Sequence, residues 1–201
     1  MSSGDAPVST GAFSRVERGG YDSRMMSSIE TLLDGFDASA QPLVLGRALG
    51  LARSGDSTDR NRFSPGHFTA SGFVVSPDGS SLLLIHHRRL DRWLQPGGHI
   101  DPEDASPIAA AAREVTEETG VIVEPIPPDL IDLDIHSIPP RAPEPAHEHF
   151  DLRFAFQALN ETLVVADEVH DAVWVPWEDV DAYAVDASVT RATAVLRQAC
   201  S

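Results

Sequence analysis

The segment from Gly97 to Val121 constrains this chain more than any other, because it contains a helix with both ends marked. Ser106 followed by Pro107 is typical of a helix start. The serine can accept a hydrogen bond from a free backbone N–H, and proline tolerates the first helical position. Gly120 is the matching stop, since glycine readily adopts the left-handed conformation after a last turn. The sequence therefore predicts a helix over 107–119, preceded by a Gly-Gly turn.

The residues of this predicted helix separate into an acidic group and an apolar group. At about 100° per residue, Glu114, Glu117 and Glu118 fall within one turn of each other on one side. Two small residues before them on that side, Ala110 and Ala111, are expected to leave open space above the carboxylates. The opposite side is expected to face the core, and it carries Ile108, Ala112, Val115 and Thr119.

The three carboxylates are unfavourable for a helix that has only to be stable. Like charges four residues apart destabilise a helix by about a few tenths of a kcal/mol, and the helix dipole disfavours negative charge in the last turn. A hard divalent cation explains the arrangement, because Mg²⁺ prefers oxygen ligands and sites with few carboxylates. Arg113, four residues before Glu117, is expected to hold a glutamate in position. For these residues alone, the alternative is a solvated acidic helix face.

The same segment resembles the Nudix box of a known hydrolase family. Its carboxyl half, REVTEETGV from Arg113 to Val121, matches the pattern Arg-Glu-apolar-any-Glu-Glu-any-Gly-apolar at every position. In the amino half, five residues lead from Gly98 to Asp104, where the family has glutamate, and eight residues rather than seven then precede Arg113. We interpret this as a one-residue expansion of the loop before the helix. The flanking stretches RWLQPGGH and DEVHDAVWVPWEDV also fit, so the resemblance runs from about His67 to the end of the chain.

The resemblance implies an α/β fold, the Nudix α/β/α sandwich with a mixed sheet, preceded here by a short helical N-terminal extension. The remaining patterns agree with this expectation. A hairpin turn is predicted at Asp78-Gly79, and the Pro-rich piece 138–145 is expected to be a surface loop. Strands are predicted over 68–76, 81–87, 130–137, 150–159 and 172–175, and further helices over 28–36, 43–52 and 188–199.

We divide the chain into three parts on these patterns. Residues 1–26 are rich in serine, glycine and charge and are expected to form a disordered tail. Residues 27–64 form the helical extension and a linker, and residues 65–201 the Nudix domain. The extension is expected either to cover the site or to form a homodimer contact.

The resemblance also implies the roles of the box residues. Glu114 and Glu118 are the expected direct ligands of Mg²⁺ or Mn²⁺, with the backbone carbonyl of Gly98 as a further ligand. Glu117 is expected to be a third ligand or to act on the attacking water, and Arg113 to orient the carboxylates. The general base stays open between Glu117 and Glu168, which lies in the loop before the closing strand.

Several residues outside the box are candidates for substrate contact. His147 and His149 are spaced to point the same way if a strand has begun, and they could contact a phosphate or a metal. The alternative for each candidate is an ordinary solvated side chain, and the three tryptophans are expected in the core. The candidates are Arg88, Arg89, His99, His147 and His149.

The charge balance restricts the partners. With 31 acidic and 15 basic residues, the formal net charge is −16. A nucleic-acid polymer or an anionic membrane needs a basic face, whereas a small phosphorylated ligand can bind through a divalent cation. The start of the chain lacks a basic leader, and no run of about 18 apolar residues occurs, so we expect a cytoplasmic protein.

The predicted activity is hydrolysis of a pyrophosphate bond in a nucleoside diphosphate linked to another group, such as a nucleoside triphosphate, an ADP-ribose-like compound or a dinucleotide. The alternative is a non-catalytic Nudix domain that binds a nucleotide-like ligand. Such domains usually lose a box carboxylate, and all three are present here. The isomerase branch of the fold depends on a cysteine in the domain, and the one cysteine here is Cys200.

Overall fold

A computed structural model describes residues 29–37, 39 and 41–199. The predicted tail over 1–26 and Cys200 lie outside the described residues. The helices are α2 (Ile29–Asp34), α3 (Pro42–Ala52), α4 (Pro107–Thr119), the 3₁₀ helix η1 (Trp177–Tyr183) and α5 (Ala187–Ala199). The strands are β1 (Gly66–Val75), β2 (Ser81–His87), β3 (Arg92–Leu94), β4 (Gly97–His99), β5 (Val123–Ile138), β6 (His147–Ala158) and β7 (Val169–Pro176). Among the described helices, none is long and apolar enough to cross a lipid bilayer.

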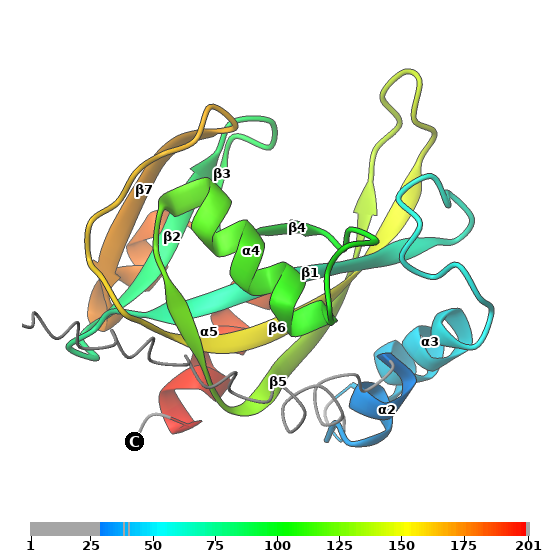
Figure 1. The fold of residues 1–201 in the computed structure, drawn as a ribbon, viewed down its shortest axis with the longest axis horizontal. Helices are drawn as coiled ribbons and strands as arrows, with labels where there is room; N and C mark the ends of the chain where they lie inside the picture. Colours follow the sequence, from blue (N-terminus) through cyan, green and yellow to red (C-terminus); the bar gives the residue numbers. More distant parts are fainter. Residues whose placement is uncertain (1–28, 38, 40, 200–201) are drawn as a thin grey trace, which may run out of the picture.

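Strand β1 lies at the centre of a mixed seven-stranded sheet (Figure 1). Over its whole length it pairs in parallel with β6, which places His67 beside His149. On its other edge it pairs antiparallel first with β4 and then with β2. Strand β5 continues the sheet beyond β6, whereas β3 and β7 both pair with β2.

Helices cover both faces of this sheet, which confirms the predicted α/β/α sandwich. Helix α4 crosses one face (Figure 1), where Ala111 and Val115 pack into a core that includes Phe68 and Phe154. Helix α5 covers the other face with a second core around Phe73. The tryptophans pack against these cores, as predicted: Trp174 on the α4 side, Trp93 and Trp177 on the α5 side.

The N-terminal helices α2 and α3 join the first of these cores. Leu33 of α2 and Leu51 of α3 are buried among its members. Arg47 of α3 forms an ion pair with Glu148 of β6. The helices predicted over 28–36 and 43–52 are therefore present, with slightly different ends.

Helix α4 has the predicted ends. The Ser106 hydroxyl accepts a hydrogen bond from the Ala109 N–H at 3.3 Å, and Gly120 adopts a left-handed φ of 70°. The Gly120 N–H closes the last turn on the carbonyl of Thr116. Both end signals act within a few residues, so they determine where the helix begins and ends.

The predicted division of α4 into two faces is partly wrong. Ala110 and Ala111 are fully buried rather than open, and Glu118 is only 6% exposed. The reason is that other segments, in addition to the sheet face, contact the helix. Strand β4 lies beside it, and the loop before β7 bonds along its last turn, where the Ala166 N–H donates to the Glu118 carbonyl.

Four strands begin before their predicted starts: β1 by two residues, β6 and β7 by three, and β5 by seven. Strand β6 begins at His147, so both histidines of the HEH sequence belong to it. Strand β5 begins at Val123, although Pro125, Pro127 and Pro128 interrupt its hydrogen bonding to β6 and a bulge follows. Proline is tolerated there because β5 is an edge strand. The Pro-rich loop over 139–146 connects these two strands as a hairpin.

Candidate active site

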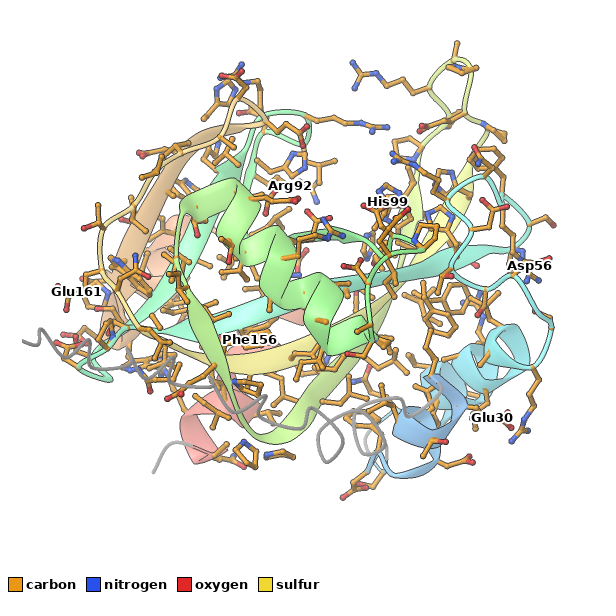
Figure 2. The ribbon with its side chains drawn as sticks, in the orientation of Figure 1. Glu30, Asp56, Arg92, His99, Phe156 and Glu161 are labelled. Carbon is orange, nitrogen blue, oxygen red and sulfur yellow. The ribbon has the colours of Figure 1, made fainter. Side chains whose placement is uncertain are left out.

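Acidic side chains from helix α4 and from the loop before β7 come together beside the backbone of strand β4. Strand β4 pairs with β1 so that Gly97 lies opposite Ser71 and Gly98 opposite Ala70. Because side chains alternate along a strand, position 98 faces α4 whereas His99 faces away from it. Figure 2 labels His99 on the side of α4 toward the β5–β6 hairpin.

Glu118 is the buried member of the acidic group. Its Oε2 accepts a hydrogen bond of 2.9 Å from the Gly97 N–H. Burial raises the pKa of Glu118 to about 8, and the charges of Glu114, Glu168 and Glu117 act in the same direction. A carboxyl group held this way needs a cation to be stable in its charged form at neutral pH.

Glu114 lies against the backbone of Gly98. A Cβ at position 98 would come within 2.7 Å of the Glu114 Cδ, so only glycine allows this approach without displacing the carboxylate. Burial raises the pKa of Glu114, although its hydrogen bond from Arg113 opposes the shift. The carboxylates of Glu114 and Glu118 thus both approach β4, at two successive residues.

Arg113 connects the members of the site. Its Nε and Nη2 donate to the two carboxylate oxygens of Asp104 at 3.0 and 2.9 Å, and Nη2 also donates to the His99 carbonyl. Its Nη1 donates to Glu114 and to Glu117, each at 2.9 Å. The hydrogen bonds that Arg113 donates to Asp104, followed by the one that it donates to Glu114, raise the pKa of Arg113 further above its usual range. The guanidinium is therefore fixed in one plane by Asp104.

The two candidate bases occupy different environments. Glu117 has a 61% exposed side chain and is paired with Arg113. Glu168 is exposed in the loop before β7, where its carbonyl accepts a hydrogen bond from the Arg88 N–H and its charge acts on Glu118. The charges of both Glu117 and Glu168 therefore act on Glu118, although the two acids come from different segments of the chain.

The predicted arginines lie in the turn between β2 and β3. Arg88 is placed beside Glu168 through its backbone. The Arg89 Nη2 reaches the Glu144 carboxylate at 3.3 Å, across to the Pro-rich loop. Arg89 lines a hollow together with Arg141, Ala142, Pro143 and Glu144.

The three predicted histidines meet on the face of the sheet opposite α4, where His67 and His136 join them. Burial lowers the pKa of His149 to about 2 and that of His99 to about 4, and it also lowers the pKa of His67. These three rings are consequently neutral near pH 7. A neutral imidazole attracts a phosphate less than an imidazolium does, whereas its free nitrogen can bind a metal ion.

Comparison with known proteins agrees with this geometry. A family model described as the NUDIX domain matches residues 66–194. The chain belongs to the NUDIX domain family. Among curated relatives of this domain, diphosphoinositol polyphosphate phosphohydrolase 2 of Rattus norvegicus is 45% identical over 49 residues, and the 3-alpha enzyme of Mus musculus is 52% identical over 40 residues. The matched parts are 24% and 20% of this chain, and 27% and 24% of those proteins, so the chain spans about a quarter of their length.

A solved NUDIX structure shares the fold of about two thirds of this chain. A hydrolase of the NUDIX family from Clostridium perfringens superimposes with a TM-score of 0.54 at 22% sequence identity, covering 66% of this chain and 97% of that one. At this identity the likeness concerns the fold.

Three features of this NUDIX domain escaped the sequence analysis. The first is the role of Asp104, whose bidentate contact with Arg113 depends on the conformation of the loop before α4. His67 was not singled out, because its partners follow only from the pairing of β1 with β6. The third feature is Arg153, which is 3% exposed and paired with Asp132 and Asp151. Its signal was visible in the DLRF sequence, where charged residues alternate with large apolar ones.

Proposed function

We propose that this chain hydrolyses a pyrophosphate bond in a small nucleotide-like diphosphate, with Mg²⁺ or Mn²⁺ bound at the carboxylates of α4. The observation that carries the proposal is the buried Glu118, whose pKa is raised by burial beside Glu114 and Glu168. The NUDIX family membership supports the same reaction class.

The residues present fit a hard divalent cation. The carboxylates of Glu114 and Glu118 and the carbonyl of Gly98 would hold it, and Glu117 would be a third carboxylate ligand. All are oxygen donors, as Mg²⁺ and Mn²⁺ require. When bound, such an ion neutralises the phosphate charge and increases the acidity of a bound water.

The protein's own residues would orient the ligands, accept a proton and contact the substrate. Arg113, fixed by Asp104, would keep Glu114 and Glu117 directed toward the ion. Glu168 would take the proton of the attacking water, because the alternative base, Glu117, is already paired with Arg113 at 2.9 Å. Arg88 and Arg89, in the turn beside Glu168, would contact the outer phosphates of the substrate.

We infer the substrate class from the charge of the chain. The curated relatives are named for diphosphoinositol polyphosphates, which carry many phosphates and need a broad basic surface. This chain has a net charge of −16, and its candidate phosphate contacts are the few arginines beside the site. A nucleotide-like diphosphate with a short phosphate chain suits that balance better.

The alternative function is a non-catalytic NUDIX domain that binds a nucleotide-like ligand. The complete set of box carboxylates disfavours it, since a binding domain has no need for a buried acid with a raised pKa. An isomerase is disfavoured by the position of the one cysteine, Cys200, which is 80 residues beyond Gly120.

The test is turnover by the purified full chain with Mg²⁺ or Mn²⁺. The panel would contain nucleoside triphosphates, oxidised nucleotides, ADP-ribose, dinucleotide polyphosphates, capped RNA and a diphosphoinositol polyphosphate, with release of phosphate and pyrophosphate measured. We expect metal-dependent turnover of a nucleotide compound that falls more than about 100-fold in Glu118→Gln, because loss of an outer partner alone costs about 10–100-fold.

Two results would contradict the proposal. Turnover that does not depend on Glu118 would place the chemistry elsewhere. Ligand binding with no turnover in any metal would favour the non-catalytic alternative. To separate the two bases, Glu168→Gln and Glu117→Gln would be compared in pH–rate profiles, and loss of the lower limb only in Glu168→Gln would identify the base.

A further inference from the structure

Five of the eight histidines of the chain form one group on the sheet face opposite helix α4. Three of them come from three adjacent strands: His67 from β1, His99 from β4 and His149 from β6. His67 and His149 are direct partners in the parallel pairing of β1 with β6. His99 is paired with Thr69, two residues along the same face of β1. Strand pairing alone therefore holds the three rings together.

One ring nitrogen of His67 is buried without a partner. The His67 side chain is fully buried, and its Nδ1 lies 3.0 Å from the Arg62 carbonyl. A carbonyl only accepts, so Nδ1 carries the proton and Nε2 presents a lone pair. That Nε2 is completely enclosed and makes no hydrogen bond within the described part of the chain. A buried acceptor without a partner destabilises the folded state unless a ligand satisfies it.

The neighbouring His147 is fixed in the same way. Its Nδ1 lies 2.9 Å from the Pro145 carbonyl, which directs its Nε2 toward the Nε2 of His149 at 3.3 Å. Of these two rings, His67 has its other nitrogen free, and a ring N–H held by a backbone carbonyl with the other nitrogen free is the arrangement that metal-binding histidines usually show.

We propose that His67, His99 and His149 bind a divalent transition-metal ion of the Zn²⁺ type. Their ligand nitrogens all lie within 4.8 Å of one another. Tetrahedral Zn²⁺ with nitrogens at about 2.0–2.1 Å requires ligand separations of about 3.3 Å, which small side-chain rotations would provide. Three protein ligands leave a fourth position for water, as in open zinc sites.

This site is distinct from the carboxylate site on α4. The two are separated by the backbone of β4, where Gly98 faces α4 and His99 faces the histidines. Their chemistry also differs, because imidazole suits Zn²⁺, Ni²⁺ and Cu²⁺ whereas carboxylate and carbonyl oxygens suit Mg²⁺ and Mn²⁺. The inference thus goes beyond the proposed function and does not depend on turnover.

The experiment is a Zn²⁺ titration of the full chain without an affinity tag, since a histidine tag would bind the same ion. The protein is first freed of metal with a chelator and then titrated calorimetrically in saturating Mg²⁺, which occupies the carboxylate site. We expect one Zn²⁺ per chain in the wild type and in Glu118→Gln. Cobalt would give the strong visible bands of a tetrahedral centre in the same position.

Histidine variants then identify the ligands. His99→Asn and His149→Asn change half-buried side chains and should fold, whereas a change at the fully buried His67 risks misfolding. Each should weaken Zn²⁺ binding by more than about 100-fold, with an unchanged circular dichroism spectrum. His170→Asn, an exposed histidine of β7, should bind as the wild type does. Absence of Zn²⁺ binding, its loss in Glu118→Gln, or wild-type affinity in both cluster variants would overturn the proposal.

Discussion

The carboxylate of Glu114 on helix α4 occupies the space that a side chain at position 98 of strand β4 would fill. A Cβ added to Gly98 would lie 2.7 Å from the Glu114 Cδ and 2.8 Å from each carboxylate oxygen. On the other side, Gly98 pairs with Ala70 of β1, so the strand cannot retreat from the helix. The absence of a side chain at position 98 would allow the Glu114 carboxylate and the Gly98 carbonyl to bind the same proposed ion.

Gly98→Ala should therefore displace Glu114 while leaving the fold intact. The clashing group is the end of a flexible side chain, so the carboxylate moves before the backbone does. We expect Mn²⁺ affinity to fall by about 10-fold or more, measured by calorimetry. Gly50→Ala on α3 is the control, because nothing lies within 4 Å of its added Cβ. Unchanged Mn²⁺ affinity in Gly98→Ala would show that Glu114 is not a ligand.

The stability of the metal-free protein should decrease as the pH rises. Burial raises the pKa of Glu118 from 4.5 to about 8, so the folded state holds a proton that the unfolded state has lost between these values. The unfolded state binds fewer protons in this window, and the free energy of unfolding falls on the order of a few kcal/mol from pH 4.5 to pH 8.

Glu118→Gln should remove most of that slope, since the amide has no proton to lose and can still accept from the Gly97 N–H. A smaller slope should remain, because the pKa of Glu114 is also raised. Thermal unfolding in EDTA from pH 5 to pH 8 checks this, and Mg²⁺ should flatten the wild-type curve. Equal slopes in the wild type and the variant would contradict the buried-acid description.

Asp104→Asn should impair the site through Arg113 without touching the metal ligands. The variant loses a charged bidentate contact at 3.0 and 2.9 Å, so the guanidinium is no longer fixed beside Glu114 and Glu117. We expect kcat to fall about 10–100-fold with little change in KM. Asp101→Asn is the graded control, because Asp101 lies 3.6 Å from Arg113 and should matter less. An equal loss in both variants would argue against a specific positioning role.

Arg153→Met should destabilise the fold by about 3–5 kcal/mol, because it removes the cation paired with the buried Asp151 and leaves Asp132 paired with Arg191. Arg153 is 3% exposed and pairs with Asp132 at 3.1 Å and Asp151 at 3.0 Å. Urea unfolding measures the loss, with the exposed Arg92→Met as a control expected to change stability by less than about 0.5 kcal/mol. A similar midpoint for both variants would mean that the buried network contributes little.

Local chemistry explains which parts of this fold could be predicted. The ends of α4 follow from Ser106 and Gly120, whose hydrogen bonds involve only their own neighbours. The start of strand β2 could be predicted for the same reason, because the turn at Asp78-Gly79 lies directly before it in the sequence. The box carboxylates were also found, since three glutamates in one turn have no structural advantage.

Long-range pairing explains what could not be predicted. The burial of Glu118 depends on Gly97, 21 residues away, which donates the hydrogen bond that holds it. The histidine group requires residues 67, 99 and 149 to lie on neighbouring strands, and no spacing along the chain encodes the parallel register of β1 and β6. The spacing of His147 and His149 did indicate one shared side, and their rings lie 5.1 Å apart.

The three residues of β4 also limit how this sequence can change over evolutionary time. Sliding the strand by one residue along β1 would turn His99 toward the glutamates and Gly98 toward the histidines, so both groups would be lost in a single step. The connection between His99 and Ser106 can take an additional residue without moving β4, and this is where we place the one residue that the chain has beyond the box pattern. A length change in that connection would leave both groups of side chains in register.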